Sequence, residues 1–402
     1  MKIGIIREGK VPPDSRVPLA PSQCAFLMKN YDLEVVVEPS AVRCYTDAEY
    51  AAAGVRLTTE LADCDWLMGI KEVPVAQLIP QKTYLFFSHT IKAQAYNRQL
   101  LQAILDKKIR LIDYEVLTDE HGERLIAFGR FAGMVGAHNA LWTYGQRSGA
   151  FQLGRLKDYF DYAAAKVDYQ KLRLPPLKIV VTGTGRVGSG AVEVLRDMDI
   201  REVPPADFVR FRYDEPVFTH LSSKHYVARI DGKAFDYQDF YAHPQYYRSA
   251  FEPYFQAADI FINGIFWDVR SPAFFSAEDM RRQDFHIAVI ADVTCDIAPK
   301  SSVPATLRAS TIADPVFGYD PQSESEIAPY QPQGIDMMTI DNLPSELPRD
   351  ASYAFGEKFL HHVLPELLDE NSPVIKRATI AENGELTAYF QYLQSYVDGV
   401  GV

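Results

Sequence analysis

The sequence predicts an α/β protein with two parallel-sheet domains and a cleft between them. Strand-length apolar runs alternate with amphipathic, helix-length segments, an order that places crossover helices between parallel strands. A glycine-rich turn follows another apolar run in the middle of the chain. The length of 402 residues suits two or more domains, since a domain has roughly 100–200 residues.

Five strands are expected in the first third of the chain. Each run is rich in β-branched or aromatic residues, and none contains proline, which interior strands exclude. Amphipathic segments that predict helices lie between them, at 22–29 and 93–107. The expected strands are Ile3–Ile6, Leu33–Val37, Trp66–Ile70, Tyr84–Phe87 and Ile109–Ile112.

The next segment, Phe131–Phe151, contains small residues at close spacing. It predicts a long connecting helix packed tightly between the domains, with an ordinary buried helix as an equal alternative. We expect a substrate-binding domain of residues 1–140 and 350–402. We expect a dinucleotide-binding domain of residues 141–349, with an aromatic-rich insertion at 213–255 in which Asp231-Gly232 signals a hairpin.

The remaining elements follow from the same patterns. Two further strands are expected at Asp259–Ile265 and Ile287–Val293, and the polar, proline-punctuated segment Asp320–Gly334 predicts a loop. Tyr353–Leu368 predicts a helix that Pro365 should kink or end early.

The composition excludes several classes of partner. Lys and Arg number 41 against 53 Asp and Glu, a formal charge of −12, so a nucleic-acid partner is not expected. No apolar stretch approaches the ~20 residues that span a bilayer, and the N-terminus lacks the apolar region of a signal peptide. We therefore expect a cytoplasmic protein without a membrane partner, while the oligomeric state stays open. Four cysteines without CxxC spacing predict neither a disulfide framework nor a metal site.

The motif Gly183-Thr184-Gly185-Arg186-Val187-Gly188 follows the apolar run Ile179–Val181 and leads into the amphipathic segment Ala191–Met198. Strand, glycine turn and helix in this order predict a dinucleotide site. The first glycine permits the tight turn, the second lets the backbone approach a pyrophosphate, and the third allows close helix–strand packing. A glycine-rich turn without a ligand is the alternative.

The residue that ends the next strand selects between NAD and NADP. We expect that strand at Phe208–Phe211, so Arg210 and Arg212 would stand where a basic side chain suits a 2′-phosphate. The sequence therefore favours NADP(H). NAD(H) stays open, because Asp214 could bind the ribose if the strand were longer, and the arginines could simply be solvated.

Polar residues follow the expected strands of the first third. Ligands bind at the carboxyl ends of parallel strands, so these side chains are expected in one cleft, although each alone is more often a surface residue. Cations would hold substrate carboxylates, and Lys71 and His89 could transfer protons. The set comprises Arg16, Lys71, Glu72, His89, Lys92, Glu115 and Arg124.

Segments around these residues closely resemble the lysine–2-oxoglutarate reductases, the lysine-forming saccharopine dehydrogenase module of aminoadipate semialdehyde synthases. The resemblance spans nearly the whole chain and extends more distantly to fungal saccharopine dehydrogenase and alanine dehydrogenase. It rests on TYLFFSHTIKAQAYNRQLL (83–101), RLIDYE (110–115), AFGRFAGMVGA (127–137), FINGIFWDVRSP (261–272) and TIDNLPSELP (339–348).

The resemblance implies two Rossmann-like domains and the reductive condensation of L-lysine with 2-oxoglutarate, using NADPH, to give saccharopine. By position, it makes Lys71 and His89 the acid–base pair and assigns the other residues to binding. Arg16, Lys92 and Arg124 would bind carboxylates, and Glu72 and Glu115 would be neighbours that tune them. Gly183, Gly185 and Gly188 would hold the pyrophosphate, and Asp341 would lie beside the cofactor.

Two differences from the fungal enzyme weaken the argument that this chain prefers NAD. Asn342 replaces a histidine, and Arg212 replaces the aspartate that binds ribose. Two alternatives stay open among enzymes, an NAD-dependent saccharopine dehydrogenase and an alanine dehydrogenase-like enzyme. A catalytically inactive nucleotide-binding sensor is the alternative from another class.

Overall fold

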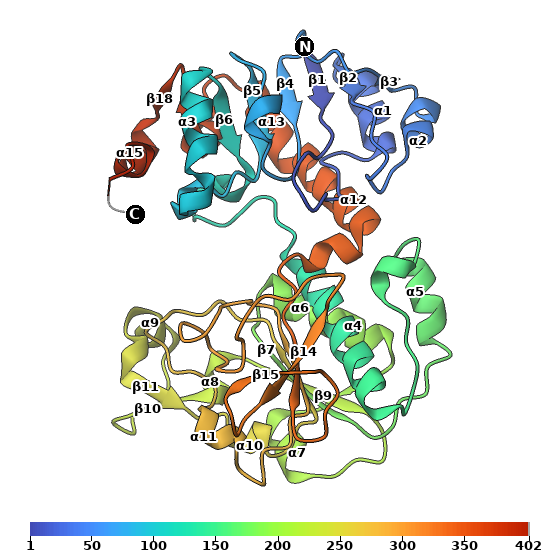
Figure 1. Ribbon diagram of the computed structural model, residues 1–402, viewed down its shortest axis with the longest axis vertical. Coiled ribbons are helices and arrows are strands. Elements are labelled where there is room, and N and C mark those ends of the chain that lie inside the picture. The colour runs from blue at the N-terminus through green and yellow to red at the C-terminus, as the bar shows by residue number, and fades with distance from the viewer. Residues whose placement is uncertain (401–402) are drawn as a thin grey trace. The chain divides into compact units, whose positions relative to one another are not determined.

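The computed structural model describes residues 1–400. The chain divides into two compact units, Met1–Phe128 with Pro348–Val402, and Gly129–Leu347. Each unit is built on one eight-stranded, mainly parallel sheet with helices packed on it (Figure 1). The predicted α/β class is confirmed. Among the described residues, no helix is both long and apolar enough to cross a bilayer.

The sheet of the first unit has the order β18-β17-β6-β5-β4-β1-β2-β3. The strands β1 to β6 run parallel, and β17 pairs antiparallel with β6. All five strands expected in the first third are confirmed, whereas the two-residue β3 and the C-terminal pair were not predicted. The strands are β1 (Lys2–Ile5), β2 (Glu34–Val37), β3 (Arg56–Leu57), β4 (Trp66–Met68), β5 (Thr83–Phe86), β6 (Arg110–Asp113), β17 (Thr379–Glu382) and β18 (Glu385–Leu386).

The helices of this unit include both amphipathic segments predicted between the strands. The segment Tyr353–Leu368 is helical but interrupted, because a π-helical turn at Phe359–Val363 precedes Pro365. Proline lacks the N–H that an uninterrupted α-helix would use there. The α-helices are α1 (Pro21–Asn30), α2 (Asp47–Ala52), α3 (Arg98–Asp106), α12 (Pro348–Lys358), α13 (Leu364–Leu368), α14 (Pro373–Ala378) and α15 (Gln394–Val397).

The sheet of the second unit has the order β15-β14-β16-β13-β12-β7-β9-β8. Strand β7 lies between β9 and β12, and the chain changes direction across the sheet at this place, where α/β sheets bind nucleotides. The strands are β7 (Lys178–Thr182), β8 (Arg201–Glu202), β9 (Val217–Leu221), β12 (Ile260–Asn263), β13 (Val289–Asp292), β14 (Val316–Asp320), β15 (Ser325–Ile327) and β16 (Ile335–Met338).

Three expectations about this unit are wrong in part. Residues 205–210 form helix α7 (Pro205–Arg210) with proline at its start, so the strand expected at Phe208–Phe211 does not exist. The strand beside β7 is β9, which lies inside the region 213–255 that we expected to be an insertion. The segment 320–334 is only partly a loop, because it contains β15, which pairs with β14.

The aromatic segment that follows β9 contains α8 (Ser223–Tyr226), β10 (Val227–Arg229), α9 (Tyr237–Ala242) and β11 (Tyr247–Ser249). Strands β10 and β11 pair antiparallel, as the hairpin signal predicted, but α9 lies between them in the chain. Gly232 adopts a φ of 76° in the turn after β10.

The small residues of α4 (Gly129–Ser148) allow it to pack against α6 (Arg186–Asp197). A Cβ atom added at Gly133 would lie 1.8 Å from the carbonyl oxygen of Val187, and one at Gly190 would lie 2.0 Å from that of Arg130. Larger side chains would therefore push the two helices apart. The whole of α4 belongs to the second unit, as do α5 (Tyr162–Tyr169), α10 (Glu252–Phe255) and α11 (Ala277–Met280).

Candidate active site

Three neighbouring parallel strands of the first unit direct predicted polar residues to one edge of their sheet. Lys71 and Glu72 follow β4, His89 follows β5, and Glu115 follows β6. His89 has a φ of 54°, in the left-handed region that residues with side chains seldom occupy. Such strained positions are common at functional sites.

Glu72 is the centre of a charged cluster. Its Oε1 lies 2.7 Å from Nδ1 of His89, and its Oε2 accepts a hydrogen bond of 2.7 Å from Nζ of Lys10. The Tyr96 hydroxyl donates to the same Oε1 at 3.4 Å. Burial alone would raise the pKa of Glu72, but the bonds with His89 and Lys10 outweigh it and lower the pKa to about 2. Glu72 is therefore ionised at neutral pH and holds the His89 ring by Nδ1.

Arg16 is only 4% exposed and is already paired inside the protein. Its Nε and Nη2 atoms donate to the two carboxylate oxygens of Asp14 at 2.9 and 2.6 Å, and its guanidinium lies 4.2 Å from the centre of the Phe128 ring. Burial lowers the pKa of Lys71, and the positive charge of Arg16 lowers it further. Arg16 thus influences Lys71 electrostatically in addition to any contact with substrate.

Glu115 connects the two remaining predicted cations. Its Oε1 accepts a 2.7 Å hydrogen bond from Nη2 of Arg124 and lies 3.9 Å from Nζ of Lys92. Its second oxygen, Oε2, is buried and has no hydrogen-bond partner within the described residues. A buried carboxylate oxygen without a donor is costly, so this atom is available to a donor on a ligand.

Glu8 is a further site residue that the sequence analysis missed. It follows β1, and its two oxygens accept hydrogen bonds from the backbone N–H groups of Ile70 and Lys71 at 2.6 and 2.9 Å. Burial raises the pKa of this carboxyl to about 8. Its position could have indicated it, since Glu8 comes shortly after the first apolar run, as Glu72 and Glu115 come shortly after later runs.

The glycine turn of the second unit has the shape of a phosphate cradle. Gly183 has a φ of 95°, and a Cβ there would lie 2.3 Å from the Gly264 carbonyl oxygen. A Cβ at Gly188 would lie 1.6 Å from the Gly183 carbonyl oxygen, whereas one at Gly185 would meet nothing within 4 Å. Gly185 is the N-cap of α6, with exposed Thr184 and Arg186 beside it and half-exposed Val187 following. These features fit a dinucleotide whose pyrophosphate approaches the start of the helix.

The two other predicted nucleotide residues have different positions. Asp341 is exposed and comes shortly after β16, a neighbour of β13 in the same sheet. Arg212 follows helix α7 rather than a strand, so the geometric support for its contact with ribose is lost. The residue that directly follows β9 is Ser222, and the preceding Leu221 accepts a 3.2 Å hydrogen bond from the N–H of Gly183.

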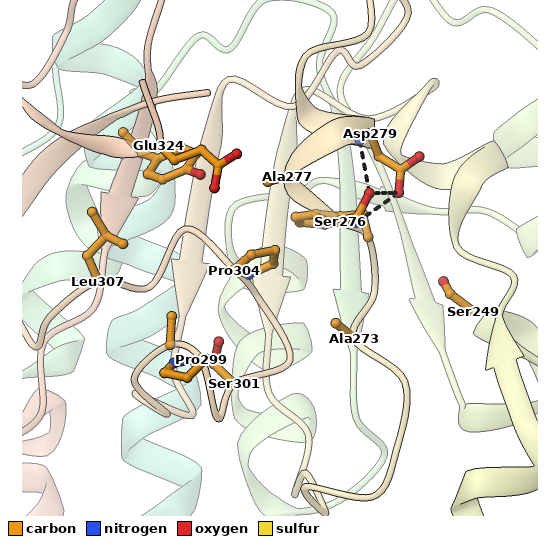
Figure 2. Close-up of a pocket in the computed structure, with 13 residues that line it drawn as sticks. Ser249, Ala273, Ser276, Ala277, Asp279, Pro299, Ser301, Pro304, Leu307 and Glu324 are labelled. Atoms are coloured by element: carbon orange, nitrogen blue, oxygen red, sulfur yellow. Dashed lines mark hydrogen bonds between the residues drawn. The ribbon is translucent and has the colours of Figure 1, made fainter. Parts of the chain in front are cut away.

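The second unit also contains a cavity of about 650 Å³, lined by none of the predicted residues (Figure 2). Three of its serine hydroxyls already donate to protein acceptors, from Ser249 to the Phe274 carbonyl, from Ser276 to Asp279, and from Ser301 to the Val303 carbonyl. The remaining walls are largely alanine, proline, leucine and phenylalanine. We therefore place the candidate site at the strand ends instead.

Comparisons with known proteins show what the chain as a whole is similar to. Residues 4–135 match the family model "Alanine dehydrogenase/PNT, N-terminal domain". The alpha-aminoadipic semialdehyde synthase of Arabidopsis thaliana is 32% identical over 97% of this chain and 41% of that protein. The saccharopine dehydrogenase [NAD(+), L-lysine-forming] of Emericella nidulans is 26% identical over 94% of this chain and 95% of that protein. These matches confirm the resemblance inferred from the sequence.

The chain is therefore similar to the alanine dehydrogenase/PNT family over residues 4–135 and to aminoadipic semialdehyde synthases and saccharopine dehydrogenases over nearly its whole length. A solved L-alanine dehydrogenase matches 99% of the chain with a TM-score of 0.66 at 16% identity, which shows the shared Rossmann-like fold. The chain spans less than half the length of the Arabidopsis relative.

Proposed function

We propose that the protein is a nicotinamide-dependent oxidoreductase of lysine metabolism that condenses L-lysine with 2-oxoglutarate and reduces the imine to saccharopine with NADPH. Similarity to alanine dehydrogenases and saccharopine dehydrogenases supports the oxidoreductase class and the nicotinamide nucleotide. The single observation that carries the finer proposal is the cluster at the strand ends of the first unit. There a lysine, a histidine–carboxylate pair and two further cations lie together.

Lys71 fits the role of a base. An amine substrate with a pKa near 10.4 must lose a proton before it can attack a ketone. The pKa of Lys71 is lowered by burial and by Arg16, so a fraction of this side chain is neutral under milder conditions than free lysine would be. We assign it the removal of the proton from the attacking amine.

His89 fits the role of the acid that assists the loss of water from the carbinolamine. Its Nδ1 is held by Glu72 at 2.7 Å, which leaves Nε2 as the nitrogen that gives or takes a proton. A carboxylate that fixes one ring nitrogen sets the tautomer and the orientation of the other. Lys10 and Tyr96 in turn hold the carboxylate of Glu72.

Substrate charge matches the remaining residues. Saccharopine carries three carboxylates, and Lys92 and Arg124 offer cations beside Glu115. The unpartnered Oε2 of Glu115 is placed to accept a hydrogen bond from an amino-acid ammonium. A mixed set of cations and one carboxylate suits amino-acid substrates better than a dicarboxylate alone.

The glycine turn from Gly183 to Gly188 supports a dinucleotide cofactor, with Gly185 and the first turn of α6 beside the pyrophosphate. When bound, the reduced nicotinamide supplies hydride to the imine carbon. The residues after β9 are Ser222, Ser223 and Lys224, without an acid. An acid at this position would bind the ribose hydroxyls of NAD, so its absence supports NADPH, with NADH as the alternative.

Product analysis tests the proposal directly. Lysine, 2-oxoglutarate and NADPH should give saccharopine by mass spectrometry together with loss of nicotinamide absorbance. Parallel reactions with pyruvate and ammonia test the alanine dehydrogenase-like alternative, which the family model of residues 4–135 brings into consideration. Alanine without saccharopine would favour that alternative, and nucleotide binding without any product would favour an inactive sensor.

A further inference from the structure

The end of strand β9 lies directly beside the glycine turn. The N–H of Gly183 donates to the Leu221 carbonyl at 3.2 Å, and Nε2 of His220 lies 2.7 Å from the Gly183 carbonyl oxygen. In nucleotide-binding sheets the residues that follow this strand face the adenosine ribose. Ser222 therefore marks the adenosine side of the proposed cofactor site.

Helix α9, from the aromatic segment after β9, is joined to this strand end by a hydrogen bond. The Tyr237 hydroxyl donates to Oγ of Ser222 at 3.1 Å. The ring of Tyr241 lies 6.4 Å from that of Tyr237, and Phe235 packs edge-on against Tyr237 at 4.8 Å. The aromatic segment thus extends from the strand end as a connected group of rings.

These tyrosines are exposed, whereas other aromatic side chains of the same segment are buried. Tyr237 is 42% exposed and Tyr241 is 66% exposed, whereas Phe240 and Tyr247 belong to the core. Tyrosine rings offer a flat apolar face on which purine bases stack, with tolerance for small differences in position. Lys224, also exposed, comes two residues after Ser222 and supplies a positive charge on the same strand connection.

We propose that Tyr237 and Tyr241 form a stacking surface for the adenine of the dinucleotide, so that the aromatic segment after β9 is a cofactor-binding element. The proposal rests on the nucleotide-dependent function above, and it adds the residues that recognise the adenosine half. It also accounts for the exposure of two large rings in the helix that is hydrogen-bonded to the end of β9.

Calorimetric titration with adenosine 2′,5′-bisphosphate tests this surface, because that probe lacks the nicotinamide half. Tyr241→Ala and Tyr237→Ala should each weaken its binding about 10-fold, the lower range for loss of one base–aromatic stack. Binding of nicotinamide mononucleotide should be unchanged. Tyr392→Ala, which removes an equally exposed tyrosine from the first unit, serves as the matched control and should bind both probes normally.

Tyr237→Phe separates stacking from the hydrogen bond to Ser222. The phenylalanine keeps the ring, so binding of the bisphosphate should stay within about 3-fold of the unmodified protein. A loss as large as that of Tyr237→Ala would overturn the stacking assignment, as would normal binding by both alanine variants.

The outcomes distinguish this proposal from the proposed function. Weaker bisphosphate binding in the alanine variants, together with an absence of saccharopine, would keep the stacking surface and remove the lysine reaction. Saccharopine formation by the unmodified protein, with unaltered bisphosphate binding in the alanine variants, would keep the lysine reaction and remove the stacking surface. If the unmodified protein bound neither the bisphosphate nor NADP⁺, both proposals would be overturned.

Discussion

The Nδ1 atom of His89 lies 2.7 Å from Oε1 of Glu72, across the ends of two adjacent parallel strands. The other carboxylate oxygen is held by Lys10, so the glutamate cannot rotate without breaking two charge-assisted bonds. This pair fixes which nitrogen of His89 faces a substrate. It also makes Glu72 a contributor to stability with a defined pH dependence.

Glu72→Gln should destabilise the protein at neutral pH and much less at low pH. The folded pKa of Glu72 is lowered from 4.5 to about 2, which corresponds to roughly 3 kcal/mol when the carboxyl is ionised in both states. This contribution is present above the unfolded pKa and is lost as the pH falls through about 2. Urea unfolding of both proteins at pH 6 and near pH 3 measures it. An equal difference in the free energy of unfolding between the two proteins at both pH values would contradict the lowered pKa of Glu72.

Glu8→Gln should reduce the loss of stability that the unmodified protein shows between pH 5 and 8. Here the folded pKa is raised to about 8, so the folded state holds a proton that the unfolded state releases, and stability falls as the pH rises through this window. Between pH 5 and 8 we expect the free energy of unfolding of the variant to fall by roughly 2–4 kcal/mol less than that of the unmodified protein. Thermal unfolding across the window measures the change. Glu60→Gln, at an exposed site, is the control and should follow the unmodified protein.

Lys71→Met should reduce turnover by roughly 10²–10⁴-fold, the usual contribution of a positioned acid–base group, while NADP⁺ binding stays within about 3-fold. The rise of rate with pH that Lys71 controls should disappear. Because burial and Arg16 lower the pKa of Lys71, that rise should lie below the usual range of lysine in the unmodified enzyme. Lys29→Met, on the exposed end of α1, controls for loss of a charge. Near-normal turnover by Lys71→Met would remove it from the mechanism.

Lys224→Glu should raise the KM for NADPH by at least about 10-fold and change that for NADH little. A positive side chain gains a charge-assisted bond to a 2′-phosphate, and reversal of its charge repels that group. Arg212→Glu is the matched comparison, since Arg212 follows a helix instead of β9. A larger effect at Arg212 than at Lys224 would restore the sequence-based assignment.

Arg124→Ala should weaken 2-oxoglutarate about 30-fold and pyruvate hardly at all, because pyruvate lacks the distal carboxylate. Loss of a cation that pairs with a desolvated carboxylate costs ~2 kcal/mol or more, and the partial exposure of Arg124 places the effect at the lower end. Steady-state kinetics with both keto acids measures it. His121→Ala, in the same connection between β6 and α4, should leave both unaffected. Equal weakening of the two keto acids would show that Arg124 does not bind the distal carboxylate.

Strong local patterns allowed much of the fold to be predicted. The five strands of the first third are continuous apolar runs without proline, and a parallel sheet buried on both faces requires such runs. The glycine turn was equally predictable, because its first and third glycines occupy places where a side chain would collide with backbone. Polar residues at the strand ends followed from the same topology.

The site beyond those residues required long-range contacts. The sequence does not predict that Glu8 binds the backbone of Lys71, since partners 63 residues apart leave no periodic signal. It also does not predict that Asp14 pairs with Arg16, because a spacing of two residues in a loop fixes no side-chain contact. Glu115 could be predicted as a neighbour of the cations, but the lack of a donor for its Oε2 appears only in three dimensions.

The sequence by itself determined the α/β class, the strands of the first unit and the glycine turn, because hydrophobic periodicity and glycine stereochemistry act over a few residues. Only the tertiary structure decided that β9 is Val217–Leu221 and that Phe208 is buried in a helix. Runs of four or five apolar residues suit either element, and pairing with β7 selects between them. That choice moves the expected nucleotide contact from Arg212 to the segment that begins at Ser222, because β9 ends there, directly after the Leu221 carbonyl that accepts from the N–H of Gly183.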